Sequence, residues 1–235
     1  MLLLSIAGIC SFKSAWAQGG PPMLTDDPAV VGFHSWEINS SINSTITNKT
    51  QLAVPYIDIN YGAFRNFHVN IESAFLLTYN KQGPSSGALG DVIVAVKYHF
   101  LKEGESIISA GTYPRLTLTG EERGFLLPLS LEKTIGRFII GEDFGIFFGE
   151  NNNRSLQNGI LLGYNVSDRI QVMGEYFVEI EYKPALETSG FMNYGFTIRL
   201  NKTFTLIGSL GKQILTPSNE EKVRFISFLG VRSDF

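Results

Sequence analysis

The chain has 235 residues, of which 44% are hydrophobic and 17% charged, with a formal net charge of -3 at pH 7. Soluble domains carry about 25% charged residues, so this chain is poor in charge, while its aromatic content excludes a disordered protein. No apolar run approaches the roughly 18 residues of a membrane-spanning helix. The small, mixed charge excludes nucleic acid as a partner. A β-rich protein, soluble or in a membrane, remains.

The first residues predict an export signal. Residues 1–10 are almost wholly apolar, and small residues stand at 15 and 17, where a signal peptidase reads them. A short buried helix is the alternative, which the glycines and prolines directly after residue 18 disfavour. We therefore expect a signal peptide at 1–17. Because Cys10 leaves with it, the mature chain would have no disulfide, catalytic thiol or cysteine-based metal site.

Residues 18–33 form a predicted N-terminal periplasmic segment. The segment is rich in glycine, and its prolines restrict the backbone and remove N–H donors, so it is not expected to be a strand. Two alternatives remain: the segment enters or caps a lumen through Asp26 and Asp27, or it is a flexible tail. If it caps the lumen, basic residues would pair with the two acids. The expected partners are Lys97, Arg199 and Arg232.

From His34 onward the hydrophobic pattern has a period of two. Apolar and mixed residues alternate over 67–77, 92–100 and 192–200. Successive side chains of a strand point to opposite faces, so each segment has one apolar and one mixed face. The pattern therefore predicts β-strands and no amphipathic helix of comparable length.

Short and long polar connections alternate along the chain. The expected short turns are 62–66, 102–105, 136–137, 167–169 and 201–202, and the expected longer loops are 43–50, 80–87, 119–124, 149–154, 181–189 and 213–222. This scheme predicts about twelve strands of roughly 9 to 14 residues, typical of a bacterial outer-membrane barrel. The expected fold class is all-β, a transmembrane antiparallel up-and-down β-barrel of about 12 strands over residues 34–235.

The composition of the two faces separates this barrel from a soluble sandwich or lipocalin-like barrel. A soluble protein would need a richly charged outer face, whereas here one face is Leu, Ile, Val, Phe and Tyr and the other is mostly Gly, Ser, Asn and Thr. The first suits lipid and the second a wet or plugged lumen. Aromatic residues also gather beside the short turns, as in an aromatic girdle. They are Tyr61, Phe64, Phe67, Tyr98, Phe100, Phe138, Tyr164 and Phe204.

The C-terminus carries an independent signal. The last predicted strand, 223–235, alternates apolar residues and ends on Phe235. A terminal aromatic residue on such a strand resembles the signal that the outer-membrane assembly machinery reads. We therefore expect Phe235 to be an assembly signal, and outer-membrane lipid and the assembly machinery to be partners.

One residue fits the pattern poorly. If the apolar residues of 138–148 face lipid, Glu142 faces lipid too, at a cost on the order of 2 kcal/mol. Either a bulge at Gly141 or Gly145 turns Glu142 inward, or it lies near an interface.

Several stretches resemble the bacterial family labelled MetA-pathway of phenol degradation, which consists of outer-membrane transporters. The most specific is Pro-Pro-Met-Leu-Thr-Asp-Asp-Pro at 21–28. Further similar stretches are 34–37, 58–62, 90–92, 96–100, 131–133, 163–164, 175–177 and 229–232. The resemblance implies a barrel and transport of small, aromatic or hydrophobic compounds. The chain departs from the family at 119–124, where a fuller Pro-Thr-Gly segment is expected.

The mixed faces predict the lining of the lumen and favour a passive channel for small solutes. The predicted lining residues are Asp58, Glu72, Asp91, Lys97, Arg115, Glu132, Asp143, Glu175, Glu179, Arg199, Arg224 and Arg232. Neither sign of charge dominates, so no selection of cations or anions is expected. A structural or adhesive barrel that binds a surface partner is the alternative, but it would need longer outer loops.

An outer-membrane lipid hydrolase is the third alternative. Such an enzyme needs a histidine within reach of a nucleophile, and the chain offers only His34, His68 and His99. The last two are expected at the periplasmic rim, away from outer-leaflet lipid. No spacing of ligands suits zinc, Asp26-Asp27 is a poor calcium site, and no dinucleotide or phosphate loop is present. We therefore expect no enzyme activity, metal or cofactor.

Overall fold

The computed structural model describes residues 21–80, 83–102, 104, 107–119, 123–150, 153–183, 185–217 and 221–235. The predicted signal peptide at 1–17 and the first residues of the predicted N-terminal segment lie outside these ranges. Over the described ranges, no helix is long and apolar enough to cross a bilayer.

The alternating segments form strands of one antiparallel 14-stranded sheet. Their bounds are β1 (Trp36–Ile46), β2 (Thr50–Phe64), β3 (Phe67–Asn80), β4 (Gly83–Leu89), β5 (Ile93–Leu101), β6 (Ser109–Thr112), β7 (Arg115–Thr117), β8 (Gly124–Ile135), β9 (Phe138–Gly149), β10 (Arg154–Asn165), β11 (Ile170–Lys183), β12 (Ala185–Arg199), β13 (Phe204–Leu215) and β14 (Phe225–Asp234). The first strand thus begins two residues later than predicted.

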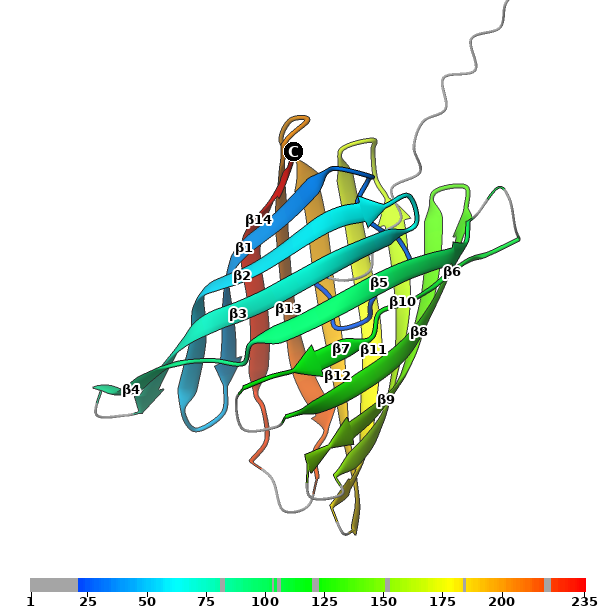
Figure 1. The fold of residues 1–235 in the computed structure, drawn as a ribbon. Coiled ribbons are helices and arrows are strands. Elements are labelled where there is room, and N and C mark those ends of the chain that lie inside the picture. Colours follow the sequence, from blue (N-terminus) through cyan, green and yellow to red (C-terminus); the bar gives the residue numbers. More distant parts are fainter. Residues whose placement is uncertain are drawn as a thin grey trace, which may run out of the picture.

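The sheet closes on itself through the pairing of the first and last strands. β1 runs antiparallel to β14 from Glu37 opposite Asp234 to Ile46 opposite Phe225. β4 and β5 lie one after the other beside β3, and β6 and β7 both lie between β5 and β8. Each of these pairs counts as one position in the wall, so the structure is a closed barrel of twelve strand positions (Figure 1). The predicted fold class is confirmed.

A proline interrupts the wall between β6 and β7. Pro114 has no N–H with which to join a ladder, so the strand stops at Thr112 and resumes at Arg115. Tyr113, in the break, is only 8% exposed. Tyr113 follows the alternation of its neighbours across this break, so its large aromatic side chain lies on the inner face, as Gly111 does.

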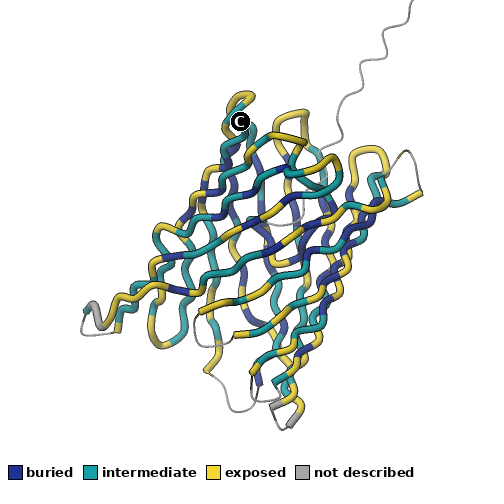
Figure 2. Tube along the Cα trace, in the orientation of Figure 1, coloured by how far each residue is buried: buried dark blue, intermediate teal, exposed yellow. Residues whose placement is uncertain are grey.

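The two faces of the wall differ as the alternation predicts. In β9, Ile139, Gly141 and Asp143 are buried, whereas the residues between them, such as Ile140 and Phe144, are exposed. Buried and exposed residues alternate around the whole wall (Figure 2). Large apolar side chains are exposed outward on most strands while polar ones are buried inward, the reverse of a soluble protein. The outer surface therefore suits lipid, and the soluble alternative is wrong.

Aromatic residues gather at the end of the barrel that carries the short turns. Trp36 packs against Tyr61 with ring centroids 4.5 Å apart, and Phe138 packs against Tyr164 at 5.0 Å. Figure 1 shows the C-terminus at this same end. An aromatic belt of this kind is typical of a membrane interface.

The predicted loop lengths need correction at the opposite end. The stretches 43–50, 80–87 and 181–189 were expected to be loops, but most of their residues belong to strands, and β1 and β2 are separated only by residues 47–49. Strands that extend beyond the bilayer have water on both faces, so their sequence is polar without being a loop. The turn at 102–105 is instead longer than predicted, because β5 ends at Leu101 and β6 begins at Ser109.

Glu142 faces outward. The register of β9 with β8 and with β10 is continuous, so no bulge turns this residue inward. Its carboxylate accepts a hydrogen bond from Asn158 Nδ2 at 3.3 Å. The neighbouring amide reduces the cost of a polar group on an apolar face.

Deletion of Phe235 is expected to impair barrel assembly. Its N–H donates to Trp36 O at 2.9 Å, and Trp36 N–H donates to Phe235 O at 3.0 Å, so the deletion removes two backbone bonds from the closing seam, worth about 1–3 kcal/mol together. The measurement is the fraction of protein with heat-modifiable electrophoretic mobility. Leu200→Ala, at an exposed turn position, is the control and should assemble normally. Equal assembly of the deletion variant would contradict a role for Phe235.

Candidate functional site in the barrel lumen

The lumen segment, residues 21–33, passes through the interior of the barrel. Figure 1 shows it as the dark-blue trace inside the wall. Met23, Asp26 and Asp27 are buried, and Thr25 is 0% exposed. A segment rich in proline cannot join the ladder of the wall, so side chains and isolated N–H and C=O groups must hold it.

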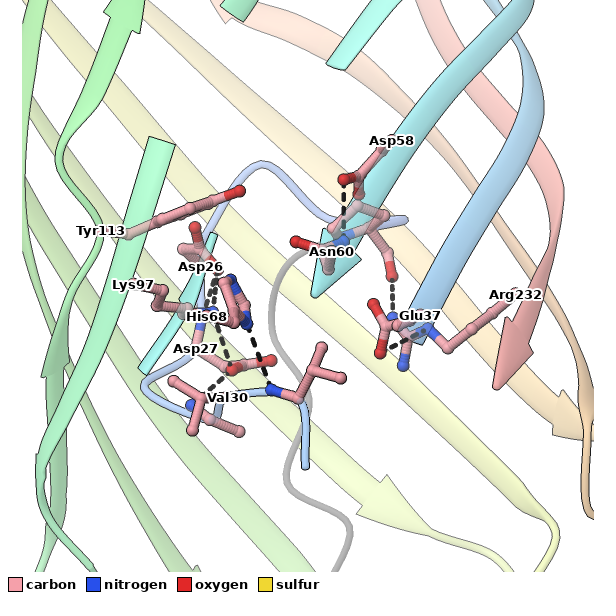
Figure 3. A pocket seen from close by; sticks show the side chains of 13 residues that line it. Asp26, Asp27, Val30, Glu37, Asp58, Asn60, His68, Lys97, Tyr113 and Arg232 are labelled. Carbon is pink, nitrogen blue, oxygen red and sulfur yellow. Dashed lines mark hydrogen bonds and ion pairs between the residues drawn. The ribbon is translucent and has the colours of Figure 1, made fainter. Parts of the chain in front are cut away.

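Two acids of the lumen segment bind two bases of the wall. Lys97 Nζ donates to Asp26 Oδ1 at 2.9 Å and to Asp27 Oδ1 at 3.1 Å, and Arg115 also binds Asp26. Lys97 lies on β5 and Arg115 on β7, at inward-facing positions of the wall. In Figure 3 both acids point toward Lys97. Opposite charges in a low-dielectric interior attract strongly, which makes this cluster the main electrostatic contact of the segment.

The two acids differ in their affinity for protons. Burial raises the pKa of Asp26, but the Lys97 and Arg115 cations outweigh it and hold the pKa at about 2. Burial raises the pKa of Asp27 to about 6, and the Asp26 carboxylate adds to that rise while Lys97 opposes it. Asp26 therefore keeps its charge at any physiological pH, whereas Asp27 gains a proton below about pH 6.

Two rings complete this side of the site. The Tyr113 ring lies 5.1 Å from Lys97 Nζ and 4.3 Å from the Arg115 guanidinium carbon, distances typical of cation–π contacts. His68 Nδ1 accepts the Val31 N–H at 3.1 Å. In a neutral imidazole the other nitrogen, Nε2, then carries the proton, and it has no partner among the described residues.

Glu175 on β11 holds the segment from the opposite wall. Its carboxylate accepts the N–H of Leu24 at 2.8 Å and of Thr25 at 2.7 Å, and Asn193 Nδ2 supports it at 3.0 Å. Hydrogen bonds to a charged acceptor are stronger than those between neutral groups. Glu175 thus supplies hydrogen-bond acceptors for two backbone N–H groups of the lumen segment.

An apolar cluster lies beside Glu175. Met23 packs with Ile139, Leu161 and Met173, all of which are buried. Close approach also requires a wall without side chains at this point, because a Cβ on Gly159 would overlap Thr25 Oγ1. Shape and polarity together therefore fit the segment to this part of the wall.

The start of the segment is held near the closing seam. Arg232 Nη2 donates to Pro21 O at 3.2 Å, and Ser209 Oγ donates to Pro22 O at 2.7 Å. Arg232 also donates to Asn39 Oδ1 at 3.2 Å and lies 3.6 Å from Glu37 Oε2. Arg232 therefore connects the seam strands to the lumen segment by binding the backbone carbonyl of Pro21. The sequence had predicted a pairing with the Asp26 or Asp27 carboxylate instead.

A pocket of about 100 Å³ remains between the lumen segment and the wall. Its lining includes Asp26, Asp27, Asp58, His68 and Lys97. Figure 3 shows these side chains around it, with Glu37 and Arg232 on the far side from Lys97. The pocket lies directly beside the charge cluster.

Most predicted lining residues lie on the inner face. Asp58 accepts hydrogen bonds from the amides of Asn39 and Asn60 at 2.9 and 2.8 Å, and also from Asn70. Asp143 accepts one from Ser130 at 2.7 Å. Two further predicted lining residues are bound within the wall: Glu72 binds Tyr56, and Glu179 binds Ser155 and Gln157. Glu132 is buried, and Arg199 on β12 is half-buried.

Two predicted lining residues lie outside the strands of the wall. Asp91 is exposed in the break between β4 and β5. Arg224 is exposed in the connection before β14 and donates to Asn48 Oδ1 at 3.0 Å. Both residues lie beyond the ends of the strands, so their place in the lining stays a prediction.

Sequence reasoning also missed several inner residues. Glu37, Asn39 and Asn60 share the period-two mixed face, so the alternation alone would have found them. Tyr113 shares this signal, because it stands two residues before the predicted lining residue Arg115. His68 was expected at the rim, yet it contacts the lumen segment.

The histidines do not form an accessible catalytic site. His34 lies before β1 with a positive φ of 62°, and His68 binds the backbone of the lumen segment. His99 Nε2 lies 2.7 Å from Ser109 Oγ, but Ser109 is buried and so is closed to a lipid substrate. Over the described ranges, no group of three His, Cys, Asp or Glu residues is arranged to hold a metal ion.

Comparison with solved structures finds barrels of the same architecture. The COG4313 outer membrane channel from Pseudomonas putida F1 superimposes with a TM-score of 0.70 at 12% identity, covering 89% of this chain and 98% of that one. The NanC porin gives 0.61 at 8% identity, with 84% and 98% covered. The KdgM porin gives 0.58 at 13% identity, with 85% and 99% covered.

These similarities show the fold of outer-membrane barrel channels. No protein-family model and no curated protein sequence matches the chain. The resemblance to the MetA-pathway family therefore stays a prediction.

Gly159→Ala is expected to loosen the lumen segment, because the added methyl group would displace Thr25 from the wall. The measurement is hydrogen exchange at the amides of Leu24 and Thr25, which should become faster. Gly141→Ala is the matched control, since a Cβ there meets no atom closer than 3.5 Å. Equal protection in both variants would contradict the close fit.

Protection of the same amides is also expected to fall as the pH rises from about 5 to about 7.5. The docked state raises the pKa of Asp27 from 3.8 to about 6. It therefore binds a proton that the free segment has released; this stabilisation is complete below the ordinary pKa of 3.8 and is lost as the pH rises through about 6. After correction for intrinsic exchange, Asp27→Asn should abolish the pH dependence. A dependence that survives in this variant would exclude Asp27 as its source.

Proposed function

We propose that this chain is a bacterial outer-membrane channel for the passive entry of small solutes, closed by its own lumen segment. The observation that carries the proposal is the polar anchoring of that segment across the barrel, from Lys97 on β5 to Glu175 on β11. An apolar outer surface and a polar interior are the features of a barrel that conducts through its lumen. The similarity to solved outer-membrane channels and porins supports this proposal.

The contacts that hold the lumen segment in place can break without unfolding the barrel. Side chains and single backbone groups hold the lumen segment, whereas strands of the wall are bound to one another by long ladders, such as those of β1 with β14 and of β11 with β10 and β12. The wall therefore keeps its own hydrogen bonds when the segment leaves. Outer-membrane location, export by the signal at 1–17, assembly through Phe235 and contact with lipid belong to the same proposal. The family resemblance suggests small aromatic or hydrophobic compounds as solutes.

The two alternatives have less support. An adhesive barrel would need long outer loops, but β1 and β2 are joined by residues 47–49 alone and β9 and β10 by residues 150–153. A lipid hydrolase would need a nucleophile open to lipid, whereas Ser109, which lies beside His99 Nε2, is buried. A channel is therefore the function that the described site favours.

Removal of residues 18–32 after the signal is expected to raise single-channel conductance in planar bilayers. The reason is that the deletion removes the segment from the lumen, while the strands of the wall keep their hydrogen bonds to one another. Heat-modifiable mobility provides the folding control. An unchanged conductance in a folded deletion variant would refute closure by the lumen segment.

Glu175→Gln is expected to raise the open probability of the full-length channel. A glutamine offers one acceptor oxygen in place of two, so one of the Leu24 and Thr25 N–H groups loses its partner, at a cost of about 1–3 kcal/mol. Glu179→Gln is the matched control, because Glu179 bonds Ser155 and Gln157 of the wall and not the segment. A similar rise in both variants would point to general loosening of the wall.

A further inference from the structure

The wall of the barrel carries a basic site that the lumen segment fills. We define the basic wall site as Lys97, Arg115, His68 and Tyr113, which come from β5, β7, β3 and the break between β6 and β7. We propose that this site binds the carboxylate of a transported solute, and that the Asp26 carboxylate occupies it as an internal substitute in the closed state. The inference rests on the proposed channel function and names its solute class.

The contacts of Asp26 are those that a bound carboxylate would make. One oxygen accepts from Lys97 Nζ at 2.9 Å, and the other accepts from Arg115. A guanidinium and an ammonium that each take one oxygen form a strong, charge-assisted carboxylate site. The donors belong to the rigid wall and the acceptor to the removable segment.

Undocking the segment would leave an imbalance of charge in the wall. Lys97 is 5% exposed, and among the described residues its ion pairs join it to Asp26 and Asp27 of the segment. A buried cation that loses its partner is strongly destabilising. Undocking therefore takes both ion-pair partners away from Lys97, and a solute carboxylate would replace them and lower the cost of opening.

Two further observations point to a ligand. His68 is 5% exposed and lines the pocket, and its Nε2 donor has no partner among the described residues. Arg115 Nε is a second buried donor without a partner there. Both orphaned atoms are donors, so the missing partner is an acceptor.

The pocket gives a solute access to this site. Its volume of about 100 Å³ adjoins Asp26, Asp27 and Lys97, and Figure 3 shows these lining side chains together. A small carboxylate that enters there can replace Asp26 without rearranging the wall. A ligand that binds only the open state shifts the equilibrium toward opening. Small carboxylates should therefore open the channel, and neutral solutes of equal size should not.

The experiment compares succinate with erythritol, a neutral four-carbon polyol, on the full-length protein in planar bilayers. Succinate is expected to raise the open probability about tenfold over erythritol, which corresponds to about 1.4 kcal/mol. Lys97→Gln should abolish the preference for succinate, whereas Lys97→Arg should retain it. Lys202→Gln, an exposed position in the turn between β12 and β13, removes the same charge elsewhere and should respond as the unmodified chain does.

The outcomes separate this inference from the channel function. If the variant without residues 18–32 conducts but succinate and erythritol open the full-length channel equally, the carboxylate site is refuted and the channel stands. A succinate response that survives in folded Lys97→Gln, as judged by heat-modifiable mobility, also refutes it. If neither the full chain nor the deletion variant conducts, both proposals fail. Should inorganic phosphate act and succinate not, the site binds phosphate and the carboxylate assignment is wrong.

Discussion

Closure of the sheet is the constraint on which the rest of this structure depends. In a bilayer every backbone N–H and C=O must find a partner within the protein, and a sheet achieves this only when its first and last strands pair. Here β1 and β14 pair over their full common length, and the terminal Phe235 bonds Trp36 in both directions. Closure separates an outer face that contacts lipid from an inner face enclosed by the wall, and so it creates a lumen.

The enclosed interior then imposes its own requirement on polar groups. Buried polar side chains need partners, and the wall supplies many of them across neighbouring strands, as Asn39, Asp58 and Asn60 illustrate. Lys97 and Glu175 find theirs in the lumen segment instead. The segment and the wall are therefore complementary, with acidic side chains facing bases on one side and backbone donors facing an acid on the other.

This complementarity explains how the closed state is both stable and reversible. The segment contributes no strand to the wall, so its departure breaks no ladder. Departure of the segment nevertheless leaves charged groups of the wall unpaired. The free-energy cost of an unpaired buried charge exceeds the stabilisation that the ion pair itself contributed. The wall is therefore rigid, and the occupant of the lumen is the part that changes. A solute that satisfies the same charges can take the place of the segment.

The amino-acid sequence by itself determined the barrel, its twelve strand positions in number and the alternation of its two faces, because a period of two is a local property that each strand displays independently. Pro-rich composition likewise excluded residues 21–33 from the sheet. Only the tertiary structure decided which groups meet inside. Asp26 and Lys97 are 71 positions apart, and Thr25 and Glu175 are 150 apart, so their contacts depend on the tilt and closure of the whole wall. The contacts of Tyr113 with Lys97 and Arg115, and the continuous register at Glu142, were decided in the same way. Register between strands is a property of the closed sheet and not of any single segment.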